Sequence, residues 1–547
     1  MKQKTTILLF ALVLAGLFTN LNAQSYLDVP PDPDFAKNYL NNVIYGDTSA
    51  TGERVADRVY RLEVGGIYYF NNSIITDGWD LRIEGAGEPV GGFSKAIILT
   101  GKNDDGGKPA EFAQVTGDVS IKNLYFSAID DLDRPLNHLI MCYKDGAILE
   151  AENIYTEWVK LHVFRFYGLN STLRATDSYF NNTTFKSGIF NGRLVGFEDL
   201  PVKEYFVQNC TVMNMQGIML KGRFNTIEKV TFDHNTIINQ AKWPFHYEYW
   251  TDGEVTNNVF FNASLMGEND QDASTQDSEG LDFGIINVVD VPDSILSQVG
   301  MSSQGERKLE VRNNLFYFDE SVQDYLARYW ESDSVRQAPW MNERTKAMFD
   351  DDAAYPYFNN EMPLTENPEL VHYPTADSMI KKVTEFRAGN NKHWGFVDID
   401  DVKISNPTDR PWDLSYSTSS ASYTAADNDL PLGDLNWFPE KKNDWITDVK
   451  DIATDVLPSN YVLEQNYPNP FNPATTIKFA IPEAGAVKLS VYNLLGQEVA
   501  VLVNGEMNAG SYSVDFNSAE FNLASGMYVY RMATSAQVLT KKLVLLK

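Results

Sequence analysis

The sequence of 547 residues is poor in cysteine and histidine: it contains two cysteines, Cys142 and Cys210, and six histidines. A disulfide scaffold is therefore excluded, and no Cys/His pattern has the spacing of a zinc site. Phosphate-binding glycine motifs and the Gly-x-Ser-x-Gly elbow are also absent, which argues against P-loop, dinucleotide-binding and α/β-hydrolase folds. Because the two cysteines lie in different coils of the repeat described below, we predict that both thiols are unpaired and buried.

Positive charge is also scarce. The chain has 45 Lys and Arg against 74 Asp and Glu, which gives a formal net charge of -29. Such a protein is not expected to bind nucleic acid or an anionic membrane in general, because both attract basic surfaces. Its 43% hydrophobic and 13% aromatic residues are nevertheless typical of a folded chain. At this length we expect at least two domains.

Long apolar runs are few. The run Ile7–Leu17 is too short to span a bilayer; it follows two lysines and precedes small residues that end at Ala23. This pattern is typical of an export signal, so we predict a signal peptide over residues 1–23. Its removal takes away Lys2 and Lys4 and changes the net charge from -29 to -31. We find no second run long enough for a membrane helix, so we expect an exported protein without a membrane span.

A slow repeat occupies residues 55–320. An alternating strand is followed by Asn and then by two or three large apolar residues, at spacings of 30, 25, 31, 26, 23 and 56 residues. The instances centre on Asn123, Asn153, Ser178, Asn209, Asn235, Asn258 and Asn314. Short strands at a period in the twenties predict a solenoid of three-strand coils, in which turn asparagines stack as a ladder. The longest interval is interpreted as two coils, with Gly284–Val289 as the missing strand.

This organisation resembles a right-handed parallel β-helix of the pectate-lyase-like superfamily. The resemblance is architectural, covers about half of the chain and brings no family-specific catalytic motif. It implies an all-β solenoid, which we place over residues 24–325. Residues 321–447 are less regular, with short helices predicted over Ser321–Trp330 and Asp377–Phe386 and an extended strap over Tyr423–Pro439. The region 326–447 is predicted to cap the solenoid.

The end of the chain has a different pattern. Residues 448–457 have the composition of a linker, and period-two alternation over 458–547 predicts a small β-sandwich. The motifs are NYPNPFNPATTIKF (466–479), VYNLLGQEV (491–499), SGMYVYRM (525–532) and the terminal KKLVLLK. They closely resemble the type A C-terminal sorting domain of the bacterial type IX secretion system. The resemblance implies an Ig-like fold, contact with the type IX machinery, and passage through the periplasm to the outer cell surface or beyond.

Basic residues recur with the coil period on the strand that precedes each Asn turn. Their separations are 28, 30 and 23 residues, and the members are Arg165, Arg193, Arg223 and His246. Residues one coil apart lie about 5 Å apart in adjacent parallel strands, so we predict a basic row along the solenoid. Alternation along single strands adds Lys221 to the face of Arg223, and Glu248 and Trp250 to the face of His246.

A basic row on an acidic protein suits a linear anionic polymer such as a uronate polysaccharide. Arginine binds carboxylates in a bidentate manner, so Arg165 and Arg193 are candidate substrate-binding residues. Trp243 or Trp250 would stack on a sugar ring, and Glu248 is a further candidate substrate-binding residue.

A lyase needs a cation that neutralises the substrate carboxylate and a base that removes the neighbouring proton. The candidates are Arg193 or Arg223 for the cation, and Lys221, His246 or Tyr247 for the base. The alternative is that these side chains are solvated and bonded to acids of neighbouring coils, such as Glu228 or Asp233.

Acidic residues gather in one insertion between coils, where Asp270, Asp272 and Asp277 would be ligands for Ca²⁺ that bridges substrate carboxylates. A solvated acidic loop accounts for the same residues. Two hypotheses stay open. The first is a secreted, polysaccharide-active protein, a monomer that acts as a lyase on an acidic, uronate-containing glycan. The second is a non-catalytic, glycan-binding or adhesive β-helix at the cell surface.

Overall fold

The computed structural model describes residues 25–448 and 461–545 with internal gaps. The gaps are 50, 56, 88–93, 104, 184–190, 223–224, 247–248, 268–282, 334–336, 388–411, 464–465, 467–468, 470, 483, 494–496, 508–509, 519–520 and 522. The chain divides into two compact units, Met1–Pro439 and Glu440–Lys547, and each is described by itself. The predicted signal peptide and most of the predicted linker lie outside the described residues.

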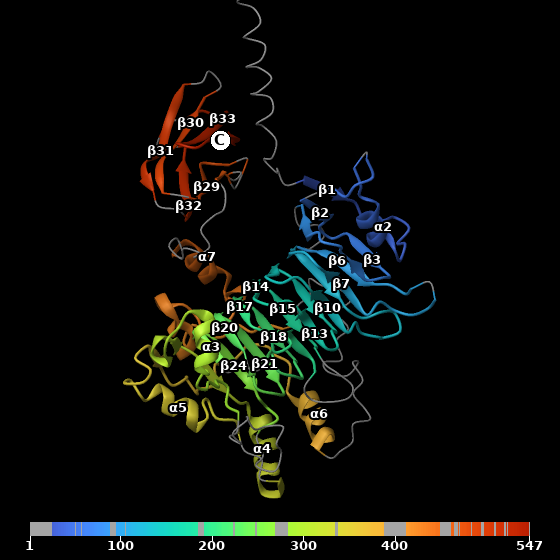
Figure 1. Ribbon diagram of the computed structural model, residues 1–547, viewed down its shortest axis with the longest axis vertical. Helices are drawn as coiled ribbons and strands as arrows, with labels where there is room; N and C mark the ends of the chain where they lie inside the picture. The colour runs from blue at the N-terminus through green and yellow to red at the C-terminus, as the bar shows by residue number, and fades with distance from the viewer. Residues whose placement is uncertain are drawn as a thin grey trace, which may run out of the picture. The chain divides into compact units, whose positions relative to one another are not determined.

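The first unit is a solenoid whose successive coils contribute strands to three parallel sheets (Figure 1). The first sheet contains β1 (Ser25–Val29), β2 (Arg58–Glu63), β5 (Leu81–Ala86), β8 (Val119–Lys122), β11 (Ile148–Glu152), β14 (Ser171–Thr176), β17 (Val202–Gln208), β20 (Thr226–Asp233), β23 (Tyr249–Thr256), β25 (Lys308–Arg312) and β27 (Phe358–Asn360). The second contains β3 (Ile67–Phe70), β6 (Ala96–Thr100), β9 (Leu124–Ser127), β12 (Tyr155–Glu157), β15 (Tyr179–Asn181), β18 (Thr211–Met213), β21 (Thr236–Gln240), β24 (Val259–Ala263) and β26 (Leu315–Tyr317). The third contains β4 (Ile74–Ile75), β7 (Glu111–Val115), β10 (His138–Cys142), β13 (His162–Phe166), β16 (Arg193–Gly196), β19 (Leu220–Lys221) and β22 (Phe245–His246). The predicted parallel β-helix is thereby confirmed.

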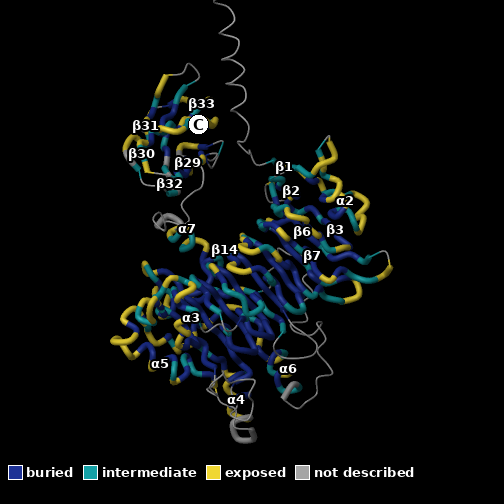
Figure 2. The backbone as a smooth tube through the Cα atoms, viewed as in Figure 1, coloured by how far each residue is buried: buried dark blue, intermediate teal, exposed yellow. Residues whose placement is uncertain are grey.

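Inward side chains of successive coils stack in rows, because parallel pairing places equivalent residues opposite one another. One row of the first sheet consists of Ile83, Ile121, Ala151, Ala175, Val207, Phe232, Val255 and Val311, all nearly inaccessible to solvent. Such rows form a continuous core inside the solenoid (Figure 2). The interior is therefore apolar, and polar chemistry is confined to the outer side of the sheets and to the turns.

Asparagines at the turn between the first and second sheets occupy two adjacent positions. The first position is left-handed, with φ between 50° and 61°, and is filled by Asn123, Asn153, Asp177, Asn209, His234, Asn257 and Asn313. The next position points inward, and there Asn235, Asn258 and Asn314 form what we call the inner asparagine ladder. The Asn235 amide N–H donates to Asn258 Oδ1 (2.8 Å), and the Asn258 amide N–H donates to Asn314 Oδ1 (3.1 Å). The predicted asparagine ladder is therefore present. However, the sequence repeat combined two neighbouring turn positions: Asn123, Asn153 and Asn209 occupy the left-handed position, whereas Asn235, Asn258 and Asn314 occupy the next one.

The interval of 56 residues is a single coil with an insertion, so its interpretation as two coils is wrong. β24 pairs directly with β26, with Val259 opposite Leu315. The segment around Ile286 instead forms a parallel bridge to Met341. An apolar run alone cannot distinguish a strand of the next coil from a segment that pairs outside the coil.

Helices flank the solenoid. They are α2 (Tyr39–Gly46), α3 (Asp293–Leu296), α4 (Glu320–Asp333), α5 (Glu343–Phe349) and α6 (Asp377–Arg387). A further helix, α7 (Pro439–Asp448), begins at the last residue of the first unit and belongs otherwise to the second. Leu40 and Ile44 of α2 join the solenoid core, while α4 and α6 correspond to the two predicted helices. The first sheet continues past the predicted solenoid end at residue 325, because β27 pairs with β25.

Residues 423–439, predicted as a strap, bind the turn and the second sheet through their backbone and side chains. The Thr211 hydroxyl donates to Asp434 Oδ2 (2.6 Å), and the amide of Leu435 donates to Asn209 Oδ1 (2.6 Å). Trp437 Nε1 donates to Thr211 Oγ1 (2.9 Å). These contacts join the strap to residues more than 200 positions earlier in the chain.

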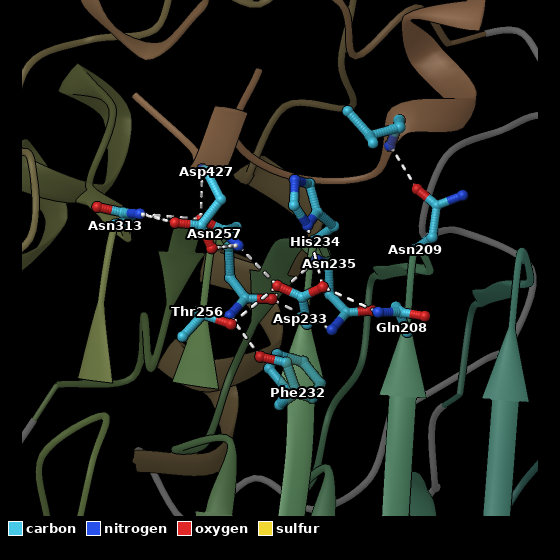
Figure 3. Close-up of polar contacts among 12 residues, drawn as sticks. Gln208, Asn209, Phe232, Asp233, His234, Asn235, Thr256, Asn257, Asn313 and Asp427 are labelled. Carbon is cyan, nitrogen blue, oxygen red and sulfur yellow. Dashed lines mark hydrogen bonds and ion pairs between the residues drawn. The ribbon is translucent and has the colours of Figure 1, made fainter. Parts of the chain in front are cut away.

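Asp233 forms the centre of a polar network at the same turn (Figure 3). Its carboxylate accepts hydrogen bonds from Gln208 (2.9 Å), Thr256 (2.8 Å) and Asn257 (2.8 Å). Burial would raise the pKa of Asp233, but the charge and hydrogen bonds of its neighbours, His234 first among them, lower it to about 2. Because the carboxylate is fully engaged by neighbouring coils, we assign it a structural role.

The second unit packs two antiparallel sheets around its own core. The strands are β28 (Val462–Leu463), β29 (Ala474–Ile481), β30 (Gly485–Tyr492), β31 (Glu498–Met507), β32 (Gly510–Asn517), β33 (Gly526–Thr534) and β34 (Val538–Leu545). The motif around Asn466 joins distant strands: its amide donates to the Tyr530 hydroxyl (2.8 Å), and Asn469 Oδ1 accepts from the Val544 amide (2.8 Å). The predicted alternation and β-sandwich are confirmed.

Both cysteines are free and buried, as predicted. Burial raises the pKa of both thiols. In the part of the chain that the structure describes, no helix is long and apolar enough to cross a membrane.

Replacement of Asn258 by Ala should lower the free energy of unfolding by about 2–4 kcal/mol, because the buried Asn235 amide and Phe232 carbonyl both lose a partner. Urea denaturation measures the change. Asn359→Ala is the matched control; Asn359 is exposed in β27, and its loss should cost less than about 0.5 kcal/mol. Equal losses in the two variants would contradict a stabilising role of the inner asparagine ladder.

Candidate functional site

The outer side of the third sheet carries polar residues because the inward and outward alternation shifts within its strands. In β10, Leu139 and Ile140 both belong to the core, and in β13 the equivalent pair is Val163 and Phe164. Two consecutive inward residues interrupt strict period-two alternation, so residues three apart face outward together. His162 and Arg165 are therefore placed on the same outer surface.

Strand register arranges these outward residues in two rows. The first row consists of Glu111, His138, His162 and Arg193, in that order across β7, β10, β13 and β16. The second row consists of Gln114, Met141, Arg165, Gly196, Lys221 and His246, and it continues across β19 and β22. Both rows run along the solenoid axis.

The register places Arg165, Lys221 and His246 in one row, but it places Arg193 in the other. The reason is coil length: Arg165 lies opposite Gly196, 31 residues later, whereas Arg193 is only 28 residues away. Arg223 and Glu248 lie outside the described residues.

The proposed Ca²⁺ ligands Asp270, Asp272 and Asp277 also lie outside the described residues. Within the described ranges, no group of three or more His, Cys, Asp or Glu side chains could hold a metal ion.

Two buried histidines, which the sequence analysis missed, hold the arginines. The rings of His138 and His162 stack with centroids 5.2 Å apart and planes 19° from parallel. Arg165 Nη1 lies 3.3 Å from His138 Nε2, and Arg193 Nη1 lies 2.9 Å from His162 Nε2. The separation of 24 residues between His138 and His162 matches the coil period, so the sequence contained a signal from which this pair could have been predicted.

Both imidazoles are neutral in the folded protein. Burial, reinforced by the charge of Arg165, lowers the pKa of His138 to about 3. Burial and the charge of Arg193 hold the pKa of His162 well below its usual value. Since Nε2 accepts a hydrogen bond from a guanidinium in each case, the ring proton sits on Nδ1. The lone pairs at Nε2 are thus occupied, and these rings position arginines rather than remove protons.

Acidic residues after β16 pair with the second row. Arg165 Nε donates to Glu198 Oε1 (2.9 Å), and Lys221 Nζ lies 3.4 Å from Asp199 Oδ1. The acids that the sequence analysis named as alternative partners bind elsewhere: Glu228 pairs with Lys203, and Asp233 with His234. Acids of a neighbouring coil therefore do bind Arg165 and Lys221, although they are not the acids that the sequence analysis named.

Gly196 is required by the histidine pair. A Cβ atom at this position would lie 2.7 Å from Cδ2 and Nε2 of His162. A side chain here would therefore displace the ring that holds Arg193.

The tryptophans do not occupy the positions predicted for sugar stacking. Trp250 is 1% exposed and belongs to the solenoid core, where it contacts Phe245. Trp243 is 3% exposed and stacks on Phe283 with ring centroids 4.2 Å apart. The error for Trp250 arises because His246 ends β22 and Trp250 belongs to β23 of another sheet, so alternation does not extend across both.

The comparisons with known proteins concern the second unit. Residues 465–546 match a family described as the secretion system C-terminal sorting domain. This segment is a type IX sorting domain. The sorting domain directs the protein to the cell surface or the extracellular space and interacts with the type IX machinery. No curated protein and no solved structure matches the chain.

Deletion of residues 458–547 should leave the solenoid folded but retained in the periplasm, because the sorting domain has its own core. Cell fractionation with immunoblotting, combined with limited proteolysis of the retained chain, measures both properties. The full chain is the control. Delivery of the shortened chain to the surface at the normal level would contradict the role of the sorting domain.

The neutral histidines make stability depend on pH. The unfolded chain binds protons at histidine below pH about 6.5, whereas folded His138 does not until pH about 3, so stability falls as the pH decreases between these values. At pH 5 the contribution of His138 is a loss of roughly 2 kcal/mol relative to neutral pH. Urea denaturation at pH 5, 6 and 7 measures it. His138→Gln keeps an acceptor for Arg165 and should reduce the slope; an unchanged slope would refute the assignment.

Proposed function

We propose that the protein is a secreted, polysaccharide-active enzyme that acts as a lyase on an acidic, uronate-containing glycan. The observation that supports the proposal is the second row, which contains Arg165, Lys221 and His246 along the outer side of the third sheet, with Gly196 between the first two. Arg193 lies in the adjacent row. On a chain with a net charge of -29, the cations Arg165, Arg193 and Lys221 on one face favour an extended polyanion.

The proposed reaction is β-elimination. A base removes the proton from the carbon next to the carboxylate, the electron pair forms a carbon–carbon double bond, and the glycosidic C–O bond breaks. The leaving oxygen takes a proton from water. A cation at the carboxylate stabilises the negative charge that develops there.

The geometry supports a division of these roles. Lys221 is ion-paired with Asp199, and an ammonium has no lone pair with which to accept a proton. We therefore assign carboxylate neutralisation to Lys221 and Arg165, and proton removal to His246, the neighbour of Lys221 in β22. We also propose Ca²⁺, bound by the acidic insertion, as a cofactor, so the assay includes Ca²⁺ as a variable.

The test follows the ultraviolet absorbance of unsaturated product when the secreted protein meets pectate, alginate and other polyuronates, with and without Ca²⁺. His246→Gln should lower the rate by at least about 100-fold and leave binding within a few-fold. The wild-type rate should rise with pH as the base deprotonates. Lys221→Met removes a cation that neutralises the substrate carboxylate and should lower the rate. Its matched control is Lys203→Met, which replaces a lysine of the first sheet whose side chain is 60% exposed; this control should not change the rate.

A non-catalytic glycan-binding role is the second candidate. The ion pairs of Arg165 with Glu198 and of Lys221 with Asp199 favour it, because a cation that already has a counter-charge stabilises less of the negative charge that develops on a substrate carboxylate during elimination. Binding to a polyuronate without any unsaturated product would support this role and reject the lyase.

A further inference from the structure

Two tyrosines extend the outer side of the third sheet beyond the second row. Tyr143 follows β10 and Tyr167 follows β13; their amides donate to the carbonyls of Val115 and Cys142, both at 2.8 Å. These bonds continue the strand register, so the two side chains occupy equivalent places in successive coils. Their rings are stacked with centroids 4.8 Å apart and planes only 4° from parallel.

The pair is accessible and has unused hydrogen-bonding capacity. Tyr143 is 41% exposed, and Tyr167 is partly exposed. Among the described residues, neither phenol hydroxyl has a hydrogen-bond partner, unlike the hydroxyls of Tyr60 and Tyr68 in the core. The preceding coil has Thr116 at this place, a small exposed residue, so the stack ends at Tyr143.

The pair is also connected to the cationic row. The Arg165 guanidinium lies over the Tyr167 ring, 4.7 Å from its centroid. Arg165 therefore contacts the tyrosine stack, His138 and Glu198 at once. An anionic ligand bound by Arg165 would have the tyrosine rings beside it.

We propose that Tyr143 and Tyr167 form the aromatic subsite for a sugar ring of an extended acidic glycan; this inference rests on the proposed function. It supplies the ring contact that Trp243 and Trp250, both buried, cannot make. Parallel aromatic rings offer an apolar face to the C–H groups of a pyranose, and the hydroxyls offer partners to its oxygens. A protein partner is disfavoured, because two rings are far smaller than the apolar patch of a stable interface.

The spacing implies an oligomeric ligand. Tyr143 and Lys221 are separated by three strand steps, from β10 through β13 and β16 to β19, which is about 14 Å. One sugar ring cannot contact both. The subsite thus binds a sugar unit away from the bond that reacts near Lys221 and His246, and affinity should rise with chain length until both regions are occupied.

The test compares oligouronates of increasing length by isothermal titration calorimetry with the full secreted chain. Tyr143→Thr introduces the residue of the preceding coil and should weaken binding of the longer oligomers about tenfold, while binding of the shortest oligomers stays unchanged. Tyr143→Phe keeps the ring and should stay within threefold of wild type. Tyr357→Thr removes a tyrosine that is 54% exposed elsewhere on the solenoid unit and is the matched control.

The outcomes separate the two levels of the proposal. If the wild-type protein binds oligouronates and Tyr143→Thr binds long oligomers equally well, the tyrosine subsite is wrong and the proposed function stands. If Tyr143→Thr does not fold, Tyr167→Phe and Tyr143→Leu replace it, and only the second should weaken binding. If the wild-type protein binds no oligouronate, the subsite and the proposed function are both rejected.

Discussion

Backbone hydrogen bonding between successive coils is the constraint on which the rest of this structure depends. Each strand is paired in parallel with the equivalent strand one coil away, so each residue lies about 4.8 Å from its counterpart. A residue type that suits one coil is therefore repeated beside itself. The core rows, the inner asparagine ladder and the outward rows of the third sheet are three results of this single geometric rule.

The consequences differ with the direction in which a row points. Inward rows consist of apolar side chains that are almost completely removed from water, and this burial supplies most of the stabilisation. At the turn, the side chain of Asn258 connects Asn235 with Asn314: its Oδ1 accepts a hydrogen bond from Asn235 Nδ2, and its Nδ2 donates one to Asn314 Oδ1. There, buried backbone groups that no sheet satisfies obtain partners from side chains.

The outward rows bring together charges that would otherwise be solvated one by one. His138 and His162 are unusual among them, because they are buried on the outer side of a sheet and remain neutral. A neutral acceptor holds a guanidinium in place without cancelling its charge, whereas the carboxylate of Glu198 holds Arg165 and compensates it. The site therefore combines both ways of orienting an arginine, and its net electrostatic effect depends on which dominates near the ligand.

The sequence alone determined three features. The solenoid follows from alternation within strands and the coil period, the sorting domain follows from its sequence motifs, and the unpaired cysteines follow from their positions in different coils. The sequence did not determine the register to the residue. Arg193 is three positions from the row predicted for it, since coils differ in length and only hydrogen bonding across coils fixes which residues align. The phase shift at Leu139 and Ile140, and the burial of Trp250 in a second sheet, are likewise decided by tertiary packing. Alternation along one strand describes a single face, whereas the site is assembled from several strands whose relative offsets arise only when the coils stack.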